Sequence, residues 1–195
     1  LYKTDEVLKA NGAETVYWKT GHSYIKRKTA ELGALAGFEK SGHFFMAGDL
    51  GHGYDDGLVA AGAVLAMLDR NPDKKLSELK AALPDAWTSL TMSPHCDDEL
   101  KYEVLERIVA EYRALADAGG SILGRKIVEA ITVNGVRVHL EDGSWVLVRA
   151  SSNKPELVVV VESMRSADDM RDLFHKEVKP RLAVHPEIGA FNQEI

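Results

Sequence analysis

The chain has 195 residues, of which 45% are apolar, and its formal net charge is −6 at pH 7. This length and composition allow a buried core in one large or two small domains, while an acidic chain without a long basic run is not typical of proteins that bind nucleic acid or an anionic membrane. A single cysteine, Cys96, excludes an internal disulfide bond. No apolar run approaches the roughly 20 residues that span a membrane, so we expect a protein of the reducing cytoplasm.

The first 84 residues alternate predicted helices with short extended runs. The pattern predicts helices at 3–10, 24–32, 58–68 and 76–83, and extended segments at 14–18, 36–38 and 44–47. Asp55 or Asp56 is placed to cap the helix at 58–68, whose alanine, leucine and valine content predicts burial on more than one face. The polar segment Glu39–His43 is compatible with a hairpin. We therefore expect an α/β domain with a mixed sheet at residues 1–84.

A segment with prolines and a tryptophan follows, and we expect 85–96 to be a linker. Asp97 or Asp98 then begins a predicted helix that continues to residue 118. Its apolar residues form one stripe, which comprises Leu100, Val104, Leu105, Ile108, Val109, Tyr112 and Leu115.

Hairpins and a closing helix are predicted for the rest of the chain. Asn134-Gly135 and Asp142-Gly143 tolerate positive φ and are typical of tight turns between strands. Ser166 is placed to cap a helix at 166–182. We therefore expect residues 97–195 to form an α+β domain, with helices on one face of an antiparallel sheet.

The loop Arg149-Ala-Ser-Ser-Asn-Lys-Pro155 lies between the last two predicted strands and is the best indication of function. A guanidinium group beside hydroxyl, amide and backbone N–H donors on a constrained loop suits a bound phosphate. The same residues also suit an ordinary polar turn, and their chemistry alone leaves both interpretations open.

Four motifs occur in an order that matches one family. They are Trp18-Lys-Thr-Gly-His-Ser23, Glu39-Lys-Ser-Gly-His43, Gly53-Tyr-Asp-Asp-Gly57 and the loop at 149–155. In order and approximate spacing they resemble the C-terminal half of the α-D-phosphohexomutases, and the bacterial phosphomannomutase/phosphoglucomutase branch is the most similar. The resemblance covers almost the whole chain. It implies that residues 1–84 are the later part of the third domain and that 97–195 are the fourth.

The resemblance also implies that the family's phosphoserine loop and its Mg²⁺-binding aspartate loop lie upstream. The sequence has no Asp-x-Asp-x-Asp cluster. Its aspartate pairs at 55–56, 97–98 and 168–169 lie at predicted helix starts, where capping and the helix dipole explain them without a metal. We therefore expect this chain to be a piece of a longer enzyme, inactive by itself, whose other domains bind Mg²⁺.

The first three motifs point to sugar recognition. A carboxylate and a hydroxyl two residues apart, as at Glu39 and Ser41, suit hydrogen bonds to vicinal sugar hydroxyls. The resemblance implies that these residues bind the hexose 3- and 4-hydroxyls in both orientations of the substrate. It further implies ligand contacts by Thr20, Gly21 and His22, and a structural or contact role for His43. Without the resemblance, Glu39 reads as an ordinary exposed glutamate.

For the phosphate, the resemblance implies binding by five residues of the last motif, Arg149, Ser151, Ser152, Asn153 and Lys154. The sequence departs from the family pattern in both loops; the departure in the sugar loop leaves the sugar undefined, whereas the phosphate loop keeps its hydroxyl and amide donors. Phe38 and Lys40 replace a glycine and a Met or Gln in the sugar loop, and Ser152-Asn153 replaces an Asn-Thr pair. No role is expected for Cys96 or for the other histidines, His52, His95, His139, His175 and His185.

Together these motifs imply the substrate-binding part of a phosphohexomutase. Such an isomerase interconverts hexose 6-phosphate and hexose 1-phosphate by phosphoryl transfer through a hexose 1,6-bisphosphate. Its partners would be the hexose phosphate and the upstream domains of the same enzyme, with no nucleic acid and no membrane. The alternative is a non-catalytic module that binds sugar phosphates or another protein.

Overall fold

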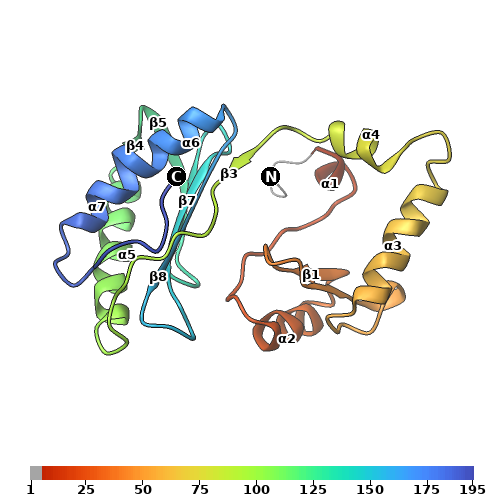
Figure 1. Cartoon of the computed structure of the whole chain (residues 1–195). Coiled ribbons are helices and arrows are strands. Elements are labelled where there is room, and N and C mark those ends of the chain that lie inside the picture. Colours follow the sequence, from red (N-terminus) through yellow and green to blue (C-terminus); the bar gives the residue numbers. More distant parts are fainter. Residues whose placement is uncertain (1–5) are drawn as a thin grey trace. The chain divides into compact units, whose positions relative to one another are not determined.

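A computed structural model describes residues 6–195, which form two compact units (Figure 1). One unit is Trp18–Pro84, and the other combines residues 6–17 with Asp85–Ile195. Among the described residues no helix is long and apolar enough to cross a membrane.

The unit at Trp18–Pro84 is built around a two-stranded antiparallel sheet. Its elements in chain order are α2 (His22–Leu32), β1 (Ala36–Phe38), β2 (Phe44–Met46), a 3-10 turn (Gly48–Leu50), α3 (Gly57–Asp69) and α4 (Leu76–Ala81). Strands β1 and β2 pair with Gly37 opposite Phe45, which confirms the hairpin. Helix α2 packs so closely on β1 that a Cβ at Gly37 would lie 2.5 Å from Ile25 Cγ2.

Two predictions for this part of the chain are wrong. The β-prone run at 14–18 is not a strand, because no neighbouring strand in the described chain supplies partners for its backbone groups. Helix α3 has no buried residue, and Leu58 is 86% exposed. The apolar sequence of α3 predicts burial on more than one face, but within this unit the helix packs against β2. A two-stranded sheet offers too little surface to cover it.

The larger unit has a six-stranded antiparallel sheet in the order β3-β8-β7-β6-β5-β4. Its strands are β3 (Trp87–Thr88), β4 (Ser121–Ile122), β5 (Arg125–Ile131), β6 (Val136–Leu140), β7 (Trp145–Ala150) and β8 (Leu157–Ser163). The predicted turns join β5 to β6 and β6 to β7, and Gly135 and Gly143 take the positive φ angles of 75° and 87° that these turns require.

The helices that follow β3 in this unit cover one face of the sheet (Figure 1). They are α5 (Lys101–Asp117), α6 (Ala167–Asp172), a π-helical stretch (Leu173–Val178) and α7 (Lys179–Ala183). The core combines alternate residues of β7 and β8, such as Val148 and Val159, with Ile108 of α5 and Phe174. Thus the α+β architecture expected for 97–195 is present. Short helix α1 (Glu6–Ala10) also belongs to this unit, and residues 3–5 of the predicted helix 3–10 lie outside the described residues.

The segment 85–96, which the sequence predicts as a linker, forms the edge of the six-stranded sheet. Trp87 pairs with Ser163, and Met92 exchanges backbone hydrogen bonds with Val159. Met92 and Cys96 are fully buried. The prolines and the lack of an alternating apolar pattern do not predict a strand here. The segment becomes a sheet edge because it pairs with β8, which lies some 70 residues later in the chain.

Candidate functional site

The segment Glu39–His43 is the loop of the β1–β2 hairpin. Glu39 N–H donates to His43 O and Gly42 N–H donates to Glu39 O, each at 3.0 Å. Gly42 has φ of 92°, a conformation that favours glycine. The turn therefore brings Glu39, Ser41 and His43 together on one short loop, in which Ser41 and His43 are exposed and Glu39 is half-buried.

Asp55 orients the histidine of this loop. Its Oδ2 lies 2.5 Å from His43 Nδ1, and its Oδ1 accepts from Phe44 N–H at 3.3 Å. The hydrogen bond and the charge of Asp55 raise the pKa of His43 above its ordinary value. A histidine held in this way is favoured as a cation with its other ring N–H available as a donor.

The two aspartates at 55 and 56 have different partners, and the sequence alone does not show which of them caps α3. Asp56 caps α3, because its Oδ1 accepts from Leu58 N–H at 2.9 Å and from Val59 N–H at 3.1 Å. The partner of Asp55 is instead His43, twelve residues earlier in the chain. Asp55 is therefore a site residue that the sequence reasoning missed. A signal for it was present in the sequence, because helix α3 needs only one capping aspartate and the pair supplies two.

Thr20, Gly21 and His22 lie at the start of α2. Gly21 is the N-cap, with φ of 125°, and its carbonyl accepts from Tyr24 and Ile25 N–H at 3.0 Å. The helix begins at His22, two residues earlier than predicted. Thr20 and His22 are exposed beside backbone N–H groups that have no partner within a helix, a setting that favours polar or anionic ligand atoms.

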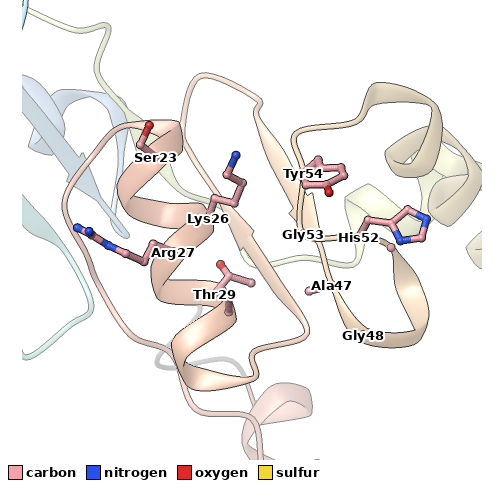
Figure 2. Close-up of a pocket in the computed structure, with 11 residues that line it drawn as sticks. Ser23, Lys26, Arg27, Thr29, Ala47, Gly48, His52, Gly53 and Tyr54 are labelled. Carbon is pink, nitrogen blue, oxygen red and sulfur yellow. The ribbon is translucent and has the colours of Figure 1, made fainter.

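A pocket of about 510 Å³ lies between α2 and the loop at 47–54 (Figure 2). Lys26 and Thr29 line it from the helix, and His52 and Tyr54 line it from the loop. The Lys26 ammonium is 5.7 Å from the centre of the Tyr54 ring. None of the residues predicted to bind the sugar lines this pocket, although the neighbouring Ser23 in the first turn of α2 does.

The predicted phosphate loop joins β7 to β8. Arg149 lies near the end of β7, and its Nη1 donates to the Ala150 carbonyl at 3.0 Å. Ser151 is buried, and its N–H donates to Glu156 O at 3.0 Å, which closes the loop. Ser152, Asn153 and Lys154 are exposed at the tip. The five predicted residues thus lie at the end of β7 and on the loop that follows it.

Lys101 is a further residue near this loop that the sequence reasoning missed. It is 3% exposed, and its ammonium donates to Asp98 Oδ1 at 2.5 Å and to the Lys154 carbonyl at 2.9 Å. A signal was present in the sequence. Lys101 precedes Val104 by three residues and Leu105 by four, so it occupies the apolar stripe of α5, where a lysine is unusual.

The carboxylates that the structure describes do not suit Mg²⁺. Within residues 6–195 no group of three or more His, Cys, Asp or Glu side chains is placed to hold a metal ion. The other aspartate pairs contact side chains of the protein instead: Asp97 contacts His95, Asp98 contacts Lys101, Asp168 contacts Arg171 and Asp169 contacts Arg125.

Cys96 and the remaining histidines lie outside these loops, apart from His52 in the pocket. Burial raises the pKa of Cys96 above its ordinary value, which keeps the thiol protonated near neutral pH. His139 and His185 are buried, whereas His95 and His175 are exposed.

Two family models match this chain in sequence. The model described as "Phosphoglucomutase/phosphomannomutase, alpha/beta/alpha domain III" matches residues 3–87, and that of the C-terminal domain matches 96–179. A phosphomannomutase/phosphoglucomutase of Pseudomonas putida is 32% identical over 184 residues, which are 93% of this chain and 36% of that protein. A phosphoglucomutase of Neisseria gonorrhoeae is 32% identical over 158 residues, which are 80% of this chain and 31% of that protein.

A solved structure gives the same result. A phosphoglucomutase/phosphomannomutase family protein from Burkholderia thailandensis superposes with a TM-score of 0.66 at 28% sequence identity. The match covers 89% of this chain and 34% of that protein. The chain therefore spans about a third of the length of the relatives it matches.

Proposed function

Because the chain belongs to the phosphoglucomutase/phosphomannomutase family, we propose that it recognises the substrate of a phosphohexomutase that interconverts hexose 6-phosphate and hexose 1-phosphate. The observation that supports the proposal best is the conformation of the two motif loops, which are the hairpin loop at 39–43 and the phosphate loop at 149–155. Each is closed by its own backbone hydrogen bonds, and each presents polar side chains to solvent.

The hairpin loop would bind the sugar ring. The Glu39 carboxylate accepts hydrogen bonds, and the Ser41 hydroxyl both donates and accepts, so together they suit two neighbouring sugar hydroxyls. Thr20, Gly21 and His22 add donors at the start of α2. His43, oriented by Asp55, would present a charged N–H donor to a substrate oxygen. Because these groups address the ring hydroxyls, the same loop serves a sugar that enters with either its 1-phosphate or its 6-phosphate outward.

The loop at 149–155 would hold the phosphate group that is not transferred. Arg149 and Lys154 supply positive charge, and Ser152 and Asn153 supply donors at the exposed tip. Ser151 supports the tip, because its Oγ faces Asn153 N at 3.5 Å. Binding of the ring by one loop and of the phosphate by the other would lower the barrier, since phosphoryl transfer depends mostly on positioning and electrostatics.

The transfer itself would need groups that these residues do not provide. Their carboxylates do not fit Mg²⁺, so no step of this proposal is assigned to a metal in this chain. We propose that Mg²⁺ and the phosphoserine belong to other domains of the enzyme, that a hexose 1,6-bisphosphate is the intermediate, and that residues 1–195 alone do not catalyse the reaction.

Isothermal titration calorimetry with mannose 1-phosphate, glucose 1-phosphate and glucosamine 1-phosphate tests the proposal. We expect saturable binding that Arg149→Ala and Glu39→Gln each weaken by about tenfold or more, equivalent to about 1.4 kcal/mol. Arg171→Ala is the matched control for Arg149→Ala, because Arg171 is an exposed arginine on α6, outside both loops, and should leave affinity unchanged.

The ranking of the three sugars would define the substrate preference. Absence of binding by all three sugars would contradict the proposal. Binding that Arg149→Ala leaves unchanged would show that the phosphate loop is assigned wrongly. Mutase activity of the purified 195-residue chain would contradict the expectation that these residues are inactive alone.

A further inference from the structure

Lys101 is one of the most buried charged side chains of the chain. It is 3% exposed, and it lies in the first turn of α5 on the face that packs into the core. An ammonium group is costly to bury unless it is fully paired, because the protein replaces only part of its hydration. The partners of Lys101 should therefore explain why a lysine occupies this position.

Those partners connect two distant segments. Asp98 Oδ1, at 2.5 Å, lies just ahead of α5, whereas the Lys154 carbonyl, at 2.9 Å, belongs to the phosphate loop 53 residues later. The same carbonyl accepts from Glu156 N–H at 2.8 Å. Cys96 N–H reinforces the connection by donating to the Pro155 carbonyl at 3.0 Å. The C-terminal side of the loop is thus fastened to the segment that leads into α5.

The bond from Lys101 has a direct consequence for a bound anion. A carbonyl oxygen that points toward a phosphate repels it. The hydrogen bond from Lys101 holds the Lys154 carbonyl oxygen toward α5, on the protein side of the loop. Because the Asp98 carboxylate offsets the charge of the ammonium, the effect on a bound anion comes from the orientation of the Lys154 carbonyl.

We propose that Lys101 is a positioning residue, which holds the loop at 149–155 in the conformation that binds the substrate phosphate. This inference rests on the proposed function. It adds a residue outside the four sequence motifs, which acts through the backbone of Lys154 and does not itself contact the ligand.

The first test measures the loop without any ligand. Hydrogen exchange of the Cys96, Ser151 and Glu156 amides should be about tenfold faster or more in Lys101→Met than in the unchanged chain, which corresponds to a local loss of about 1.4 kcal/mol. The matched control is Lys176→Met, because Lys176 is an exposed lysine paired with Asp172 at 2.7 Å. It should leave the exchange of these amides unchanged.

The second test measures affinity by calorimetry with the hexose 1-phosphate that binds best. We expect Lys101→Met to weaken binding about tenfold, Lys101→Arg to retain part of the affinity, and Lys176→Met to change nothing. If Lys101→Met does not fold, Lys101→Gln gives a weaker form of the comparison, because it removes the charge and its amide donor ends one atom short of the lysine nitrogen, so a smaller change in the same direction is expected.

The two tests separate the possible failures. Unchanged loop exchange in Lys101→Met would overturn the proposal. A lowered melting temperature with unchanged affinity would also overturn it, since it would show that Lys101 serves stability only. If the unchanged chain binds no hexose phosphate, the proposed function fails, and the role of Lys101 in ordering the loop is still decided by hydrogen exchange.

Discussion

Arg125 offers a stringent test of the energetics of the larger unit. Its side chain is 1% exposed, and its Nη1 donates to Asp142 Oδ2 at 3.1 Å and to Asp169 Oδ2 at 2.8 Å. It thus connects the β6–β7 turn to the first turn of α6. Arg125→Met keeps much of the apolar volume of the side chain but removes its positive charge. The partly buried carboxylates of Asp142 and Asp169 then lose the cation that they share.

The expected loss follows from what remains around the carboxylates. Removing one partner of a buried ion pair typically costs about 3–5 kcal/mol. Asp142 and Asp169 are each about one-fifth exposed, and each keeps another partner. Asp142 still contacts Arg165 at 2.8 Å, and Asp169 still accepts from Ser163 Oγ at 2.6 Å. We therefore expect the lower end, about 3 kcal/mol of unfolding free energy at pH 7. The control Arg165→Met, which removes a half-exposed partner of Asp142, should cost about 1 kcal/mol or less.

The assay is urea unfolding of a Trp18→Phe background, in which the remaining tryptophans, Trp87 and Trp145, both lie in the larger unit. The effect should also depend on pH. Burial opposes the ionisation of Asp142, but hydrogen bonds from Ser144 and Arg125 outweigh it and hold the pKa of Asp142 below its ordinary value. A depressed carboxyl pKa stabilises the fold above the unfolded pKa, and this contribution is lost as pH falls through the folded pKa.

The difference between Arg125→Met and the unchanged chain should therefore shrink as the pH falls below about 4, the ordinary aspartate pKa, because the stabilising contribution of Asp142 is lost there. A loss at pH 7 no larger than that of Arg165→Met would refute the reasoning. A loss that stays constant into the acid range would show that packing, and not charge, accounts for it.

Three further predictions concern single positions. Asp55→Asn should lower the pKa of His43 toward its ordinary value in an NMR titration, because the carboxylate favours the protonated ring, and an unchanged titration would contradict this contact. Gly135→Ala should destabilise the β5–β6 turn by about 1–3 kcal/mol in thermal unfolding, since φ is 75° there and a Cβ would lie 2.2 Å from the Val148 carbonyl oxygen; an unchanged melting temperature would contradict it. Cys96 should react with a thiol reagent only in denaturant, because it is fully buried and its pKa is raised, and rapid labelling of the folded chain would contradict its burial.

The sequence alone determined the features that depend on near neighbours. Gly135 and Gly143 specify tight turns, the apolar stripe predicts most of the buried face of α5, and the Ser166 side chain accepts from Asp169 N–H as the predicted cap. These outcomes are decided within a few residues by φ preference, by helical period and by a local hydrogen bond. The motifs also identified the family, and the two motif loops are local enough to be read as loops.

Only the tertiary structure decided how similar local sequences are used. Asp55 and Asp56 are equivalent as caps in the sequence, and the position of His43 on the hairpin separates them. Lys101 is unusual in the sequence as a lysine in the apolar stripe of α5, but only the loop 53 residues later shows its acceptor. The same reason explains the wrong predictions for 14–18 and α3 and the role of 85–96 as a sheet edge. Strand pairing and burial depend on which distant surface is available, and no local pattern contains that information.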